Sequence, residues 1–450
     1  VASILFDFRQ FKSTENEPIG LAFGQCAHIV ESEPDQLAFQ LAGRLPGNLS
    51  CVADARSRLE GGTVQIGRTC HISLAPKPNL LTSTDGPLRQ TMAAHTDWIR
   101  TLSVSADGAF MLSGSNDMTV KLWSLADAQL VHHMQVHQHL VRAVAFVGGS
   151  KFGCSCAEDS KLVVYDLETG SVQRQIVLGQ GRSPVKIHCG IPVPLYPDQP
   201  DVTPEHLALA LSSVPGSEQQ IYVGYGVTVQ LFDTSTGKLA RELVGAKSQV
   251  DDVAAASQTV ACGCVDGTIL VWKGQQTSAI HTLACPDECR AVSLSQDGLQ
   301  LLAACDDTIS RLWQLPMQPG VDVPSPKLLG SEDTGHEDWI HCCALSAHGD
   351  VAVTGSDDGT LRMWRISAKG GSVSEIGKVT LNTGVFACEL RADSVALSGS
   401  LDIKAWSIAQ AEQEAKSSTS LGWHEGDVVA VAVADAKTGL SLGRTDGQLK

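Results

Sequence analysis

Long apolar runs are missing from this 450-residue sequence. None approaches the ~20 residues that a membrane-spanning helix needs, so the sequence predicts no transmembrane segment. The first residues also lack an initiator Met and the charged-then-apolar pattern of a signal peptide. The sequence begins abruptly at Val1 and stops at Lys450 within a phrase that recurs upstream, which indicates a fragment of a longer protein.

Positive charge is scarce. The 33 Lys and Arg residues are outnumbered by 49 Asp and Glu, which gives a net charge of -16. This balance disfavours general affinity for nucleic acid or for anionic membranes, so we expect neither as a partner. An RNA-associated subunit of a ribonucleoprotein remains an alternative function.

The 14 cysteines include no CxxC pair. A structural zinc site needs four ligands at tetrahedral positions, and the strand-like runs that carry these cysteines do not offer them. We therefore expect buried free thiols, a reducing compartment and a cytoplasmic protein. A metal cluster of His132, His133, His137 and His139 is a minor alternative, and the prediction is no metal. No GxxxxGK[ST] loop is present, and we expect no cofactor.

A phrase of 29 residues, from a histidine to an aromatic residue, recurs at 95–123, 137–165 and 336–364. The terminal aromatics lie 40–42 residues apart, with two larger gaps of 67 and 51 residues. Four short alternating strands per unit of ~40–45 residues are typical of β-propeller blades. We predict an all-β propeller of seven or eight four-stranded blades. The aromatics are Trp123, Tyr165, Phe232, Trp272, Trp313, Trp364 and Trp406.

We assign the propeller to residues 86–450. A proline-rich stretch at about 184–218 is expected to be an irregular insertion, because proline cannot donate to a β-ladder. The last blade, which begins at His424, is expected to be truncated. Residues 86–94 form a free outer strand that should complete this last blade and close the ring.

The region before the propeller has a different pattern. Residues 1–60 show apolar spacings of three and four, with Pro34 at a helix start, and predict a short α-helical segment. Residues 61–85 are expected to be an extended linker.

Four residue types recur within the phrase, and on them the units resemble WD repeats. In that family His, Ser or Thr, Asp and Trp form a hydrogen-bonded chain through each blade. The resemblance implies structural tetrads in the first, second and sixth units. In the second unit Tyr165 stands in place of the tryptophan. The residues are His95, Ser113, Asp117, Trp123; His137, Ser155, Asp159; and His336, Thr354, Asp358, Trp364. Other units are incomplete. Those at Asp266 and Asp307 lack the histidine, the unit that ends at Trp406 has a shortened turn that holds Asp402, and the unit that ends at Phe232 keeps almost none of the pattern.

A His–Ser–Asp set could also be a hydrolytic triad. Its recurrence in several units favours an internal brace, because an enzyme needs one nucleophile, and we predict no catalytic residue. A propeller-fold hydrolase remains an alternative. Strongly shifted pKa values of channel carboxylates outside the tetrads would favour that alternative.

The stretches HIVESEPDQLAFQLAGRLPG and PLRQTMAAHTDWIRTLSVSADG resemble the junction between a helical linker and the WD repeats of NACHT or NB-ARC (STAND-type) signalling ATPases. This resemblance implies that the chain is the WD-repeat part of a larger signalling ATPase. The propeller would then contact a nucleotide-binding domain that precedes Val1.

The predicted function is a non-catalytic protein–protein interaction scaffold or sensor domain. A propeller presents loops on two faces, and a peptide or a domain of another protein can bind at the mouth of the central channel. Aromatic and arginine residues next to the tetrads suit such contacts. The candidate partner-binding residues are Trp98, Arg100, Asn116, Arg142, Glu158, Trp339, His341 and Asp357.

Overall fold

The computed structural model describes residues 87–178, 208–417, and four short strands at 186–188, 191–193, 428–433 and 439–443. Within 208–417, residues 215, 317–320, 331–334, 368–371, 382 and 392–393 are not described. The helical segment expected at 1–60 and the linker expected at 61–85 lie outside the described residues. Among those residues, no helix has the length and apolar character needed to cross a bilayer.

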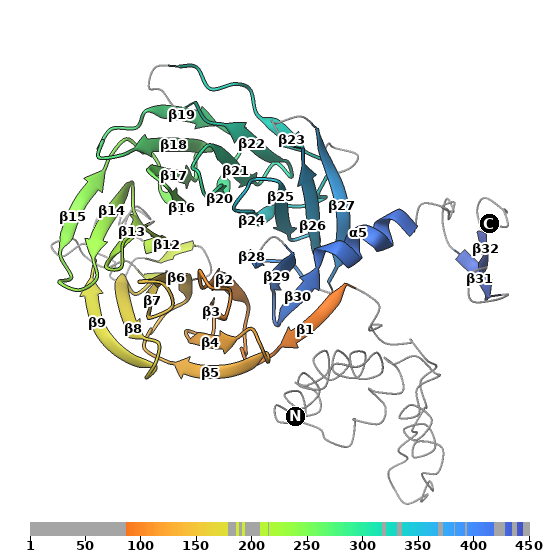
Figure 1. Ribbon diagram of the computed structural model, residues 1–450, viewed down its shortest axis with the longest axis horizontal. Helices are drawn as coiled ribbons and strands as arrows, with labels where there is room; N and C mark the ends of the chain where they lie inside the picture. The colour runs from red at the N-terminus through yellow and green to blue at the C-terminus, as the bar shows by residue number, and fades with distance from the viewer. Residues whose placement is uncertain are drawn as a thin grey trace, which may run out of the picture.

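Seven antiparallel four-stranded sheets are arranged as blades around a central axis (Figure 1). In six blades the strands follow sequence order from the centre to the rim. The first three blades, from the innermost strand outward, are β2 (Ile99–Val104), β3 (Phe110–Ser115), β4 (Val120–Ser124), β5 (Gln129–Met134); β6 (Val141–Val147), β7 (Phe152–Ala157), β8 (Lys161–Asp166), β9 (Ser171–Val177); and β12 (Ala208–Ser213), β13 (Gln220–Tyr225), β14 (Thr228–Asp233), β15 (Leu239–Leu243).

The next three blades have the same order. They are β16 (Val250–Ala256), β17 (Thr259–Cys264), β18 (Thr268–Lys273), β19 (His281–Ala284); β20 (Cys289–Leu294), β21 (Gln300–Cys305), β22 (Ser310–Gln314), β23 (Lys327–Leu329); and β24 (Ile340–Leu345), β25 (Val351–Ser356), β26 (Thr360–Ile366), β27 (Val373–Thr380).

The seventh blade joins the two ends of the ring. Strands β28 (Ala387–Arg391), β29 (Val395–Gly399) and β30 (Ile403–Ser407) are completed at the rim by β1 (Leu88–Met92). In this pairing Met92 lies opposite Ile403, and Leu88 lies opposite Trp406. The N-terminal strand therefore closes the ring, as the sequence predicts for residues 86–94, but on a different blade.

The prediction that this closing strand completes a truncated unit after His424 is wrong. β1 occupies the outer edge of β30 instead, so seven blades already form a closed ring. Strands β31 (Val428–Val433) and β32 (Gly439–Gly443) pair with each other in a separate two-stranded sheet.

The proline-rich stretch overlaps the third blade. Strand β12 at Ala208–Ser213 is the innermost strand of that blade, although the expected insertion extended to about residue 218. Upstream of it, β10 (Lys186–His188) and β11 (Ile191–Val193) pair as a short hairpin. The sequence ALALSS alternates small and large side chains as a blade strand does. The prolines on either side of it led to the prediction of a loop.

The recurring aromatics lie in the third strand of every blade, and all seven are buried. Each packs between neighbouring blades with aliphatic and thiol side chains, so seven apolar clusters alternate with the sheets around the ring. The innermost strands of neighbouring blades also contact each other around the whole ring. Burial of this apolar surface is the main stabilising contribution to the disc.

The turn between the second and third strands needs left-handed backbone. The residue after the turn aspartate has a positive φ in five blades: 67° at Met118, 56° at Ser160, 77° at Gly267, 65° at Thr308 and 74° at Gly359. Glycine adopts this conformation without steric cost, whereas Met118 and Thr308 adopt it against their intrinsic preference. Aspartate stabilises the turn by accepting a hydrogen bond from the amide two residues later, as Asp117 does from Thr119.

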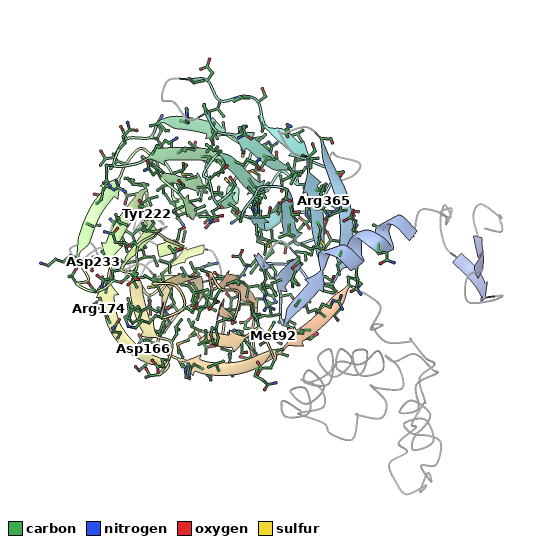
Figure 2. The ribbon with its side chains drawn as sticks, viewed as in Figure 1. Met92, Asp166, Arg174, Tyr222, Asp233 and Arg365 are labelled. Carbon is green, nitrogen blue, oxygen red and sulfur yellow. The ribbon has the colours of Figure 1, made fainter. Side chains whose placement is uncertain are left out.

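Side chains at the rim hold adjacent elements together (Figure 2). Arg365 lies beside helix α5 (Ile408–Ser417), and its guanidinium donates to Glu412 at 2.8 Å. Arg174 on the second blade donates to the carbonyl of Ser235 on the third at 2.6 Å. These contacts join neighbouring elements at the outer edge of the ring, and neither of them involves the central channel.

Candidate functional site

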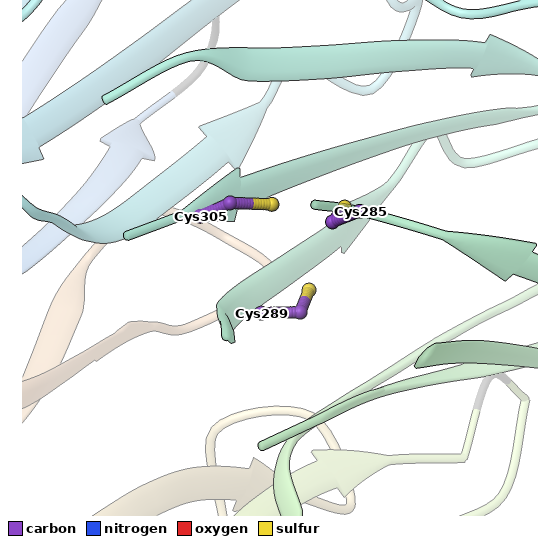
Figure 3. Close-up of side chains that lie close together, drawn as sticks. All are labelled: Cys285, Cys289 and Cys305. Carbon is purple, nitrogen blue, oxygen red and sulfur yellow. The ribbon is translucent and has the colours of Figure 1, made fainter. Parts of the chain in front are cut away.

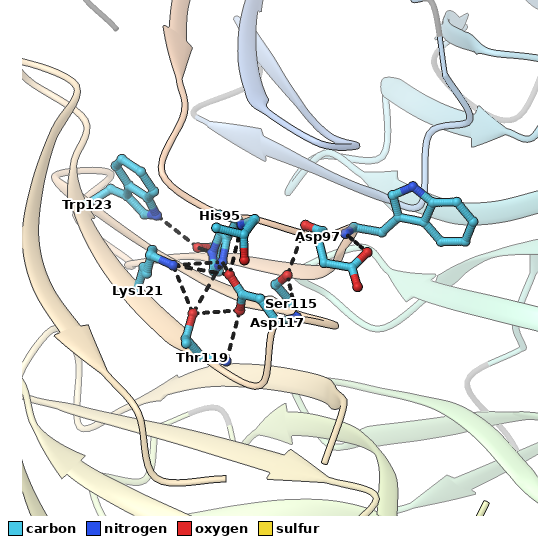
Figure 4. A network of polar contacts seen from close by, with 10 residues as sticks. His95, Asp97, Ser115, Asp117, Thr119, Lys121 and Trp123 are labelled. Atoms are coloured by element: carbon cyan, nitrogen blue, oxygen red, sulfur yellow. Dashed lines mark hydrogen bonds and ion pairs between the residues drawn. The ribbon is translucent and has the colours of Figure 1, made fainter. Parts of the chain in front are cut away.

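The first blade contains a continuous polar network (Figure 4). His95 Nδ1 lies 2.8 Å from Asp117 Oδ2, and His95 Nε2 lies 2.7 Å from Ser113 Oγ. The indole of Trp123 donates to the same Ser113 oxygen at 2.8 Å. Lys121 extends the network with a donation to Asp117 at 3.3 Å.

The second blade repeats this geometry. His137 lies 3.1 Å from Asp159 and 2.6 Å from Ser155, and the Tyr165 hydroxyl lies 2.9 Å from Ser155 Oγ. A phenol therefore occupies the place of the indole and reaches the same serine.

The sixth blade has the full set. His336 lies 3.0 Å from Asp358 and 2.8 Å from Thr354 Oγ1. The Trp364 indole donates to Thr354 at 2.9 Å. The residues that the sequence singled out as tetrads are thus brought together in all three blades.

Burial determines what these networks can do. Ser113, Ser155 and Thr354 have no exposed surface, so a substrate cannot reach their hydroxyls. Burial would raise the pKa of Asp117, but hydrogen bonds from His95 and Thr119 outweigh it and hold that pKa well below its usual range. The same balance, with His336 and Thr360 as donors, lowers the pKa of Asp358. Each network is an ionised aspartate with satisfied partners inside a blade, and it braces the strands.

A second set of side chains surrounds the central channel. Arg100, Arg142, Arg290 and His341 all lie 17 residues before the turn aspartate of their blades, at the start of the innermost strands. Asp251 and Phe386 line the same cavity, which has a volume of about 400 Å³.

Four of these residues pair with the side chain that precedes the turn aspartate. Arg100 Nε donates to Asn116 at 3.2 Å, and Arg142 Nε donates to Glu158 at 2.8 Å. Arg290 forms two bonds to Asp306, at 3.0 and 2.9 Å, and His341 Nε2 lies 2.9 Å from Asp357 Oδ2. The structure therefore places the pairs Arg100–Asn116, Arg142–Glu158 and His341–Asp357 at one mouth of the channel.

Four residues of the mouth were not predicted from the sequence, namely Arg290, Asp306, Asp251 and Phe386. The unit of Arg290 lacks the histidine that marks the start of the phrase, so that marker does not lead to Arg290. The constant spacing of 17 residues before the turn aspartate would have found it.

Two large aromatic side chains stand at this mouth. Trp98 is 41% exposed and Trp339 is 50% exposed. Trp98 stacks on Phe386 with ring centroids 4.9 Å apart, and the Arg100 guanidinium lies 5.2 Å from the centroid of Trp98. Arg290 lies 6.0 Å from the centroid of Trp339. Arginine stacked on exposed indole is typical of binding surfaces.

The charges around the channel are unevenly distributed. Burial, with the nearby charge of Arg142, lowers the pKa of Arg100 to about 10. On the side of the fourth and fifth blades, Arg290 is surrounded by acids: Glu288 at 2.9 Å and Asp251 at 3.8 Å. Burial raises the pKa of Glu288 to about 7.

Two further carboxylates line the channel wall, Asp252 and Glu389. Burial raises the pKa of each to about 7, and each accepts a backbone hydrogen bond, from Val292 and Leu390 respectively.

The described part of the chain has ten cysteines, and all ten are buried free thiols. The four histidines at 132, 133, 137 and 139 do not come together as a ligand set. Within the described part of the chain, one group of side chains has ligand atoms close enough to share an ion, and it consists of Cys285, Cys289 and Cys305. This group has three members and was not singled out from the sequence, where the argument concerned a four-ligand zinc site.

The sequence model of a family described as "WD domain, G-beta repeat" matches residues 86–124 and 328–365. The chain carries WD40 repeats. The two matched segments contain the tetrads of the first and sixth blades, the two in which His, Ser or Thr, Asp and Trp are all present. The WD40 signal is therefore strongest where the polar network is complete.

Three curated proteins are among those to which the chain is similar at low identity. It is 23% identical to the serine-threonine kinase receptor-associated protein of Gallus gallus over 289 residues, 64% of this chain and 73% of that protein. It is 22% identical to MST50-interacting protein 11 of Pyricularia oryzae over 310 residues, 63% of this chain and 98% of that protein. It is 22% identical to the nuclear distribution protein PAC1 of Arthroderma otae over 349 residues, 71% and 70% of the two chains.

Proposed function

We propose that this WD-repeat protein is a non-catalytic interaction scaffold that binds a segment of another protein at the channel mouth. The observation that carries the proposal is the pair of indoles, Trp98 and Trp339, that stand about half exposed beside arginines on a rigid ring. Exposed tryptophan costs solvation free energy in the unbound protein, and a partner that covers it recovers that cost. The relatives named as receptor-associated and as interacting proteins support this class of function.

The distribution of charge indicates what the bound segment carries. Arg100 and Arg142 lie together on one side, and Arg100 has a neutral amide as its partner. Asp251 and Glu288 lie on the other side around a single arginine. A segment with an apolar anchor, an acidic group near Arg100 and a basic group near Glu288 matches this mouth.

Site-specific photocrosslinking tests the proposal. A photoreactive residue in place of Trp339 in the full chain should crosslink to the partner in a cell extract. The same residue in place of Val177, which is exposed on the rim strand β9, serves as the control. Equal crosslinking of one protein from both positions would contradict binding at the mouth.

The finer identity, that of a cytoplasmic signalling or sensor domain of a STAND-type ATPase, rests on the resemblance of residues 1–125. The free buried thiols support a reducing compartment. In this version of the proposal the mouth contacts the ATPase's own nucleotide-binding domain. A gene that encodes no phosphate-binding loop upstream of Val1 would contradict it.

One observation favours a second candidate, a propeller-fold hydrolase. Asp252, Glu288 and Glu389 lie outside the tetrads and have pKa values raised to about 7, which suits general acid–base chemistry. Burial is the largest cause of all three shifts, and Asp252 and Glu389 are held by backbone amides rather than by a nucleophile. Hydrolysis of an ester or peptide panel by the full chain, lost in Glu389→Gln, would establish the enzyme instead of the scaffold.

A further inference from the structure

The fifth blade replaces part of the polar network with thiols. In the first blade the histidine precedes the turn aspartate by 22 residues, His95 to Asp117, and the same spacing from Asp307 leads to Cys285. The serine of the network, four residues before the aspartate, is Ala303 in this blade. The imidazole and the hydroxyl that brace other blades are thus both missing here.

Two more cysteines lie close to Cys285 in this blade. Cys305 occupies the place of Ser115, two residues before the aspartate, and Cys289 occupies the place of Ile99 at the start of the inner strand. The three Sγ atoms all lie within 4.8 Å of one another (Figure 3). They come from three separate elements, namely the connection after β19, the first residue of β20 and the last residue of β21.

We propose that Cys285, Cys289 and Cys305 bind a thiophilic metal ion, Zn²⁺ being the expected one, as a structural brace of the fifth blade. Thiolates are the preferred ligands of such ions. Since a Zn–S bond is about 2.3 Å long, two sulfurs on one tetrahedral ion are about 3.8 Å apart. The observed limit of 4.8 Å requires each pair to approach by about 1 Å at most, which side-chain rotation supplies.

The surroundings would shield an ion from solvent. Cys289 and Cys305 have no exposed surface, and Cys285 is 8% exposed, so the ion would be shielded on most sides and reached past Cys285. Three thiolates and one divalent ion together have a negative net charge. Arg311, buried at the place of Lys121, is the nearby cation, and it donates to Asp307 at 2.9 Å. Three cysteines are one protein ligand fewer than a structural zinc site usually has, so a water molecule would fill the fourth tetrahedral position.

The proposed ion would link elements of the fifth blade that lack the hydrogen bonds of the first blade. In the first blade, hydrogen bonds tie the turn at Asp117 to the strand that carries Ser113 and to the connection that carries His95. In the fifth blade, metal–sulfur bonds would tie the connection that carries Cys285 to the end of β21 at Cys305, beside the turn, and to the start of the inner strand β20 at Cys289. Binding should therefore stabilise the native state by mass action and raise the melting temperature.

The test uses the reduced full chain, stripped of metal with a chelator and titrated with Cd²⁺ as a spectroscopic probe of thiolate ligation. We expect a Cd–thiolate charge-transfer absorption that saturates at one ion per chain, displacement of Cd²⁺ by Zn²⁺, and a melting temperature several degrees higher with either ion. The variants Cys285→Ser and Cys305→Ser should each bind at least tenfold more weakly. Cys154→Ser, at a buried cysteine of the second blade, should bind like the wild type.

Three results would overturn the proposal. These are no saturable absorption in the folded wild type, equal absorption in Cys154→Ser and Cys285→Ser, and a disulfide between two of the three cysteines in the freshly purified chain. The first needs no variant, so a misfolded substitution cannot conceal it.

Discussion

The guanidinium carbon of Arg100 lies 4.7 Å from the ring centroid of Phe386. Arg100 belongs to the first blade and Phe386 to the entry of the seventh, so the contact crosses the closure of the ring. Together with Trp98, which stacks on Phe386, these side chains form one continuous aromatic and cationic surface at the mouth.

Arg100→Lys should weaken partner binding without unfolding the protein. Lysine keeps the charge but loses the planar group that stacks on the rings and donates to Asn116. A cation–π contact contributes about 0.5–2 kcal/mol, which corresponds to a loss of about twofold to thirtyfold in affinity. Titration of the partner by calorimetry measures it. Arg174→Lys on the rim is the matched control, and an equal loss there would argue against the mouth.

Thr354→Val tests the internal brace. Valine has nearly the shape of threonine, but it leaves Trp364 Nε1 without its acceptor and His336 Nε2 without its hydroxyl partner in a buried site. We expect the free energy of unfolding to fall by about 1–3 kcal/mol. Denaturant unfolding measures it, with Thr380→Val, at an exposed position on β27, as the control. A neutral Thr354→Val would mean that the hydroxyl does not brace the blade.

Glu389 should make stability depend on pH. Burial raises its pKa in the folded protein to about 7, whereas in the unfolded chain a glutamate titrates near 4.3. Between about pH 4 and 7 the folded state therefore binds a proton that the unfolded state has lost, and the free energy of unfolding falls as pH rises through this window.

Glu389→Gln should remove this contribution. Because the carboxyl lines a cavity that water can enter, we expect a difference of about 1–3 kcal/mol between the two proteins at pH 8 relative to pH 4. Thermal unfolding across pH 4–8 measures it. Glu168→Gln, at an exposed position, controls for the loss of one charge. Identical pH profiles for wild type and Glu389→Gln would contradict the assignment.

Met92→Ala tests the closure of the ring. Met92 is 2% exposed and lies opposite Ile403 in the pairing of β1 with β30. Truncation of a buried methionine costs about 2–5 kcal/mol. Gln90→Ala, on the same strand and only partly buried, should cost much less in chemical denaturation. Equal, small effects of both changes would mean that β1 does not close the propeller.

Much of this fold is visible in the sequence, because each blade repeats a local pattern of strands, turns and one buried aromatic. Closure is not local. The alternation of residues 88–92 fits the open edge of any blade. The choice of β30 over the strands after His424 depends on which blade lies next to β1 in the folded ring. The degenerate third blade shows the same limit, since its inner strand at Ala208–Ser213 is surrounded by prolines.

The candidate site was partly predictable for a related reason. Arg100, Arg142 and His341 follow a recognisable histidine and were found, whereas Arg290 follows Cys285 and was missed. The thiol cluster joins residues from three elements, and its proximity depends on how the blade entry packs against the turn of β21. Spacing rules for metal motifs describe single loops and do not cover such a set.

Affinity capture with the full chain tests the central claim most directly. The claim is that the tetrads brace a rigid disc and that the mouth does the binding. Proteins retained by the wild type should be lost from the Trp98→Ala/Trp339→Ala double variant. They should be kept by Val177→Ala/Leu239→Ala, which removes equally exposed apolar side chains from the rim strands. The same proteins retained by all three chains, at equal yield and with all three folded, would contradict the account.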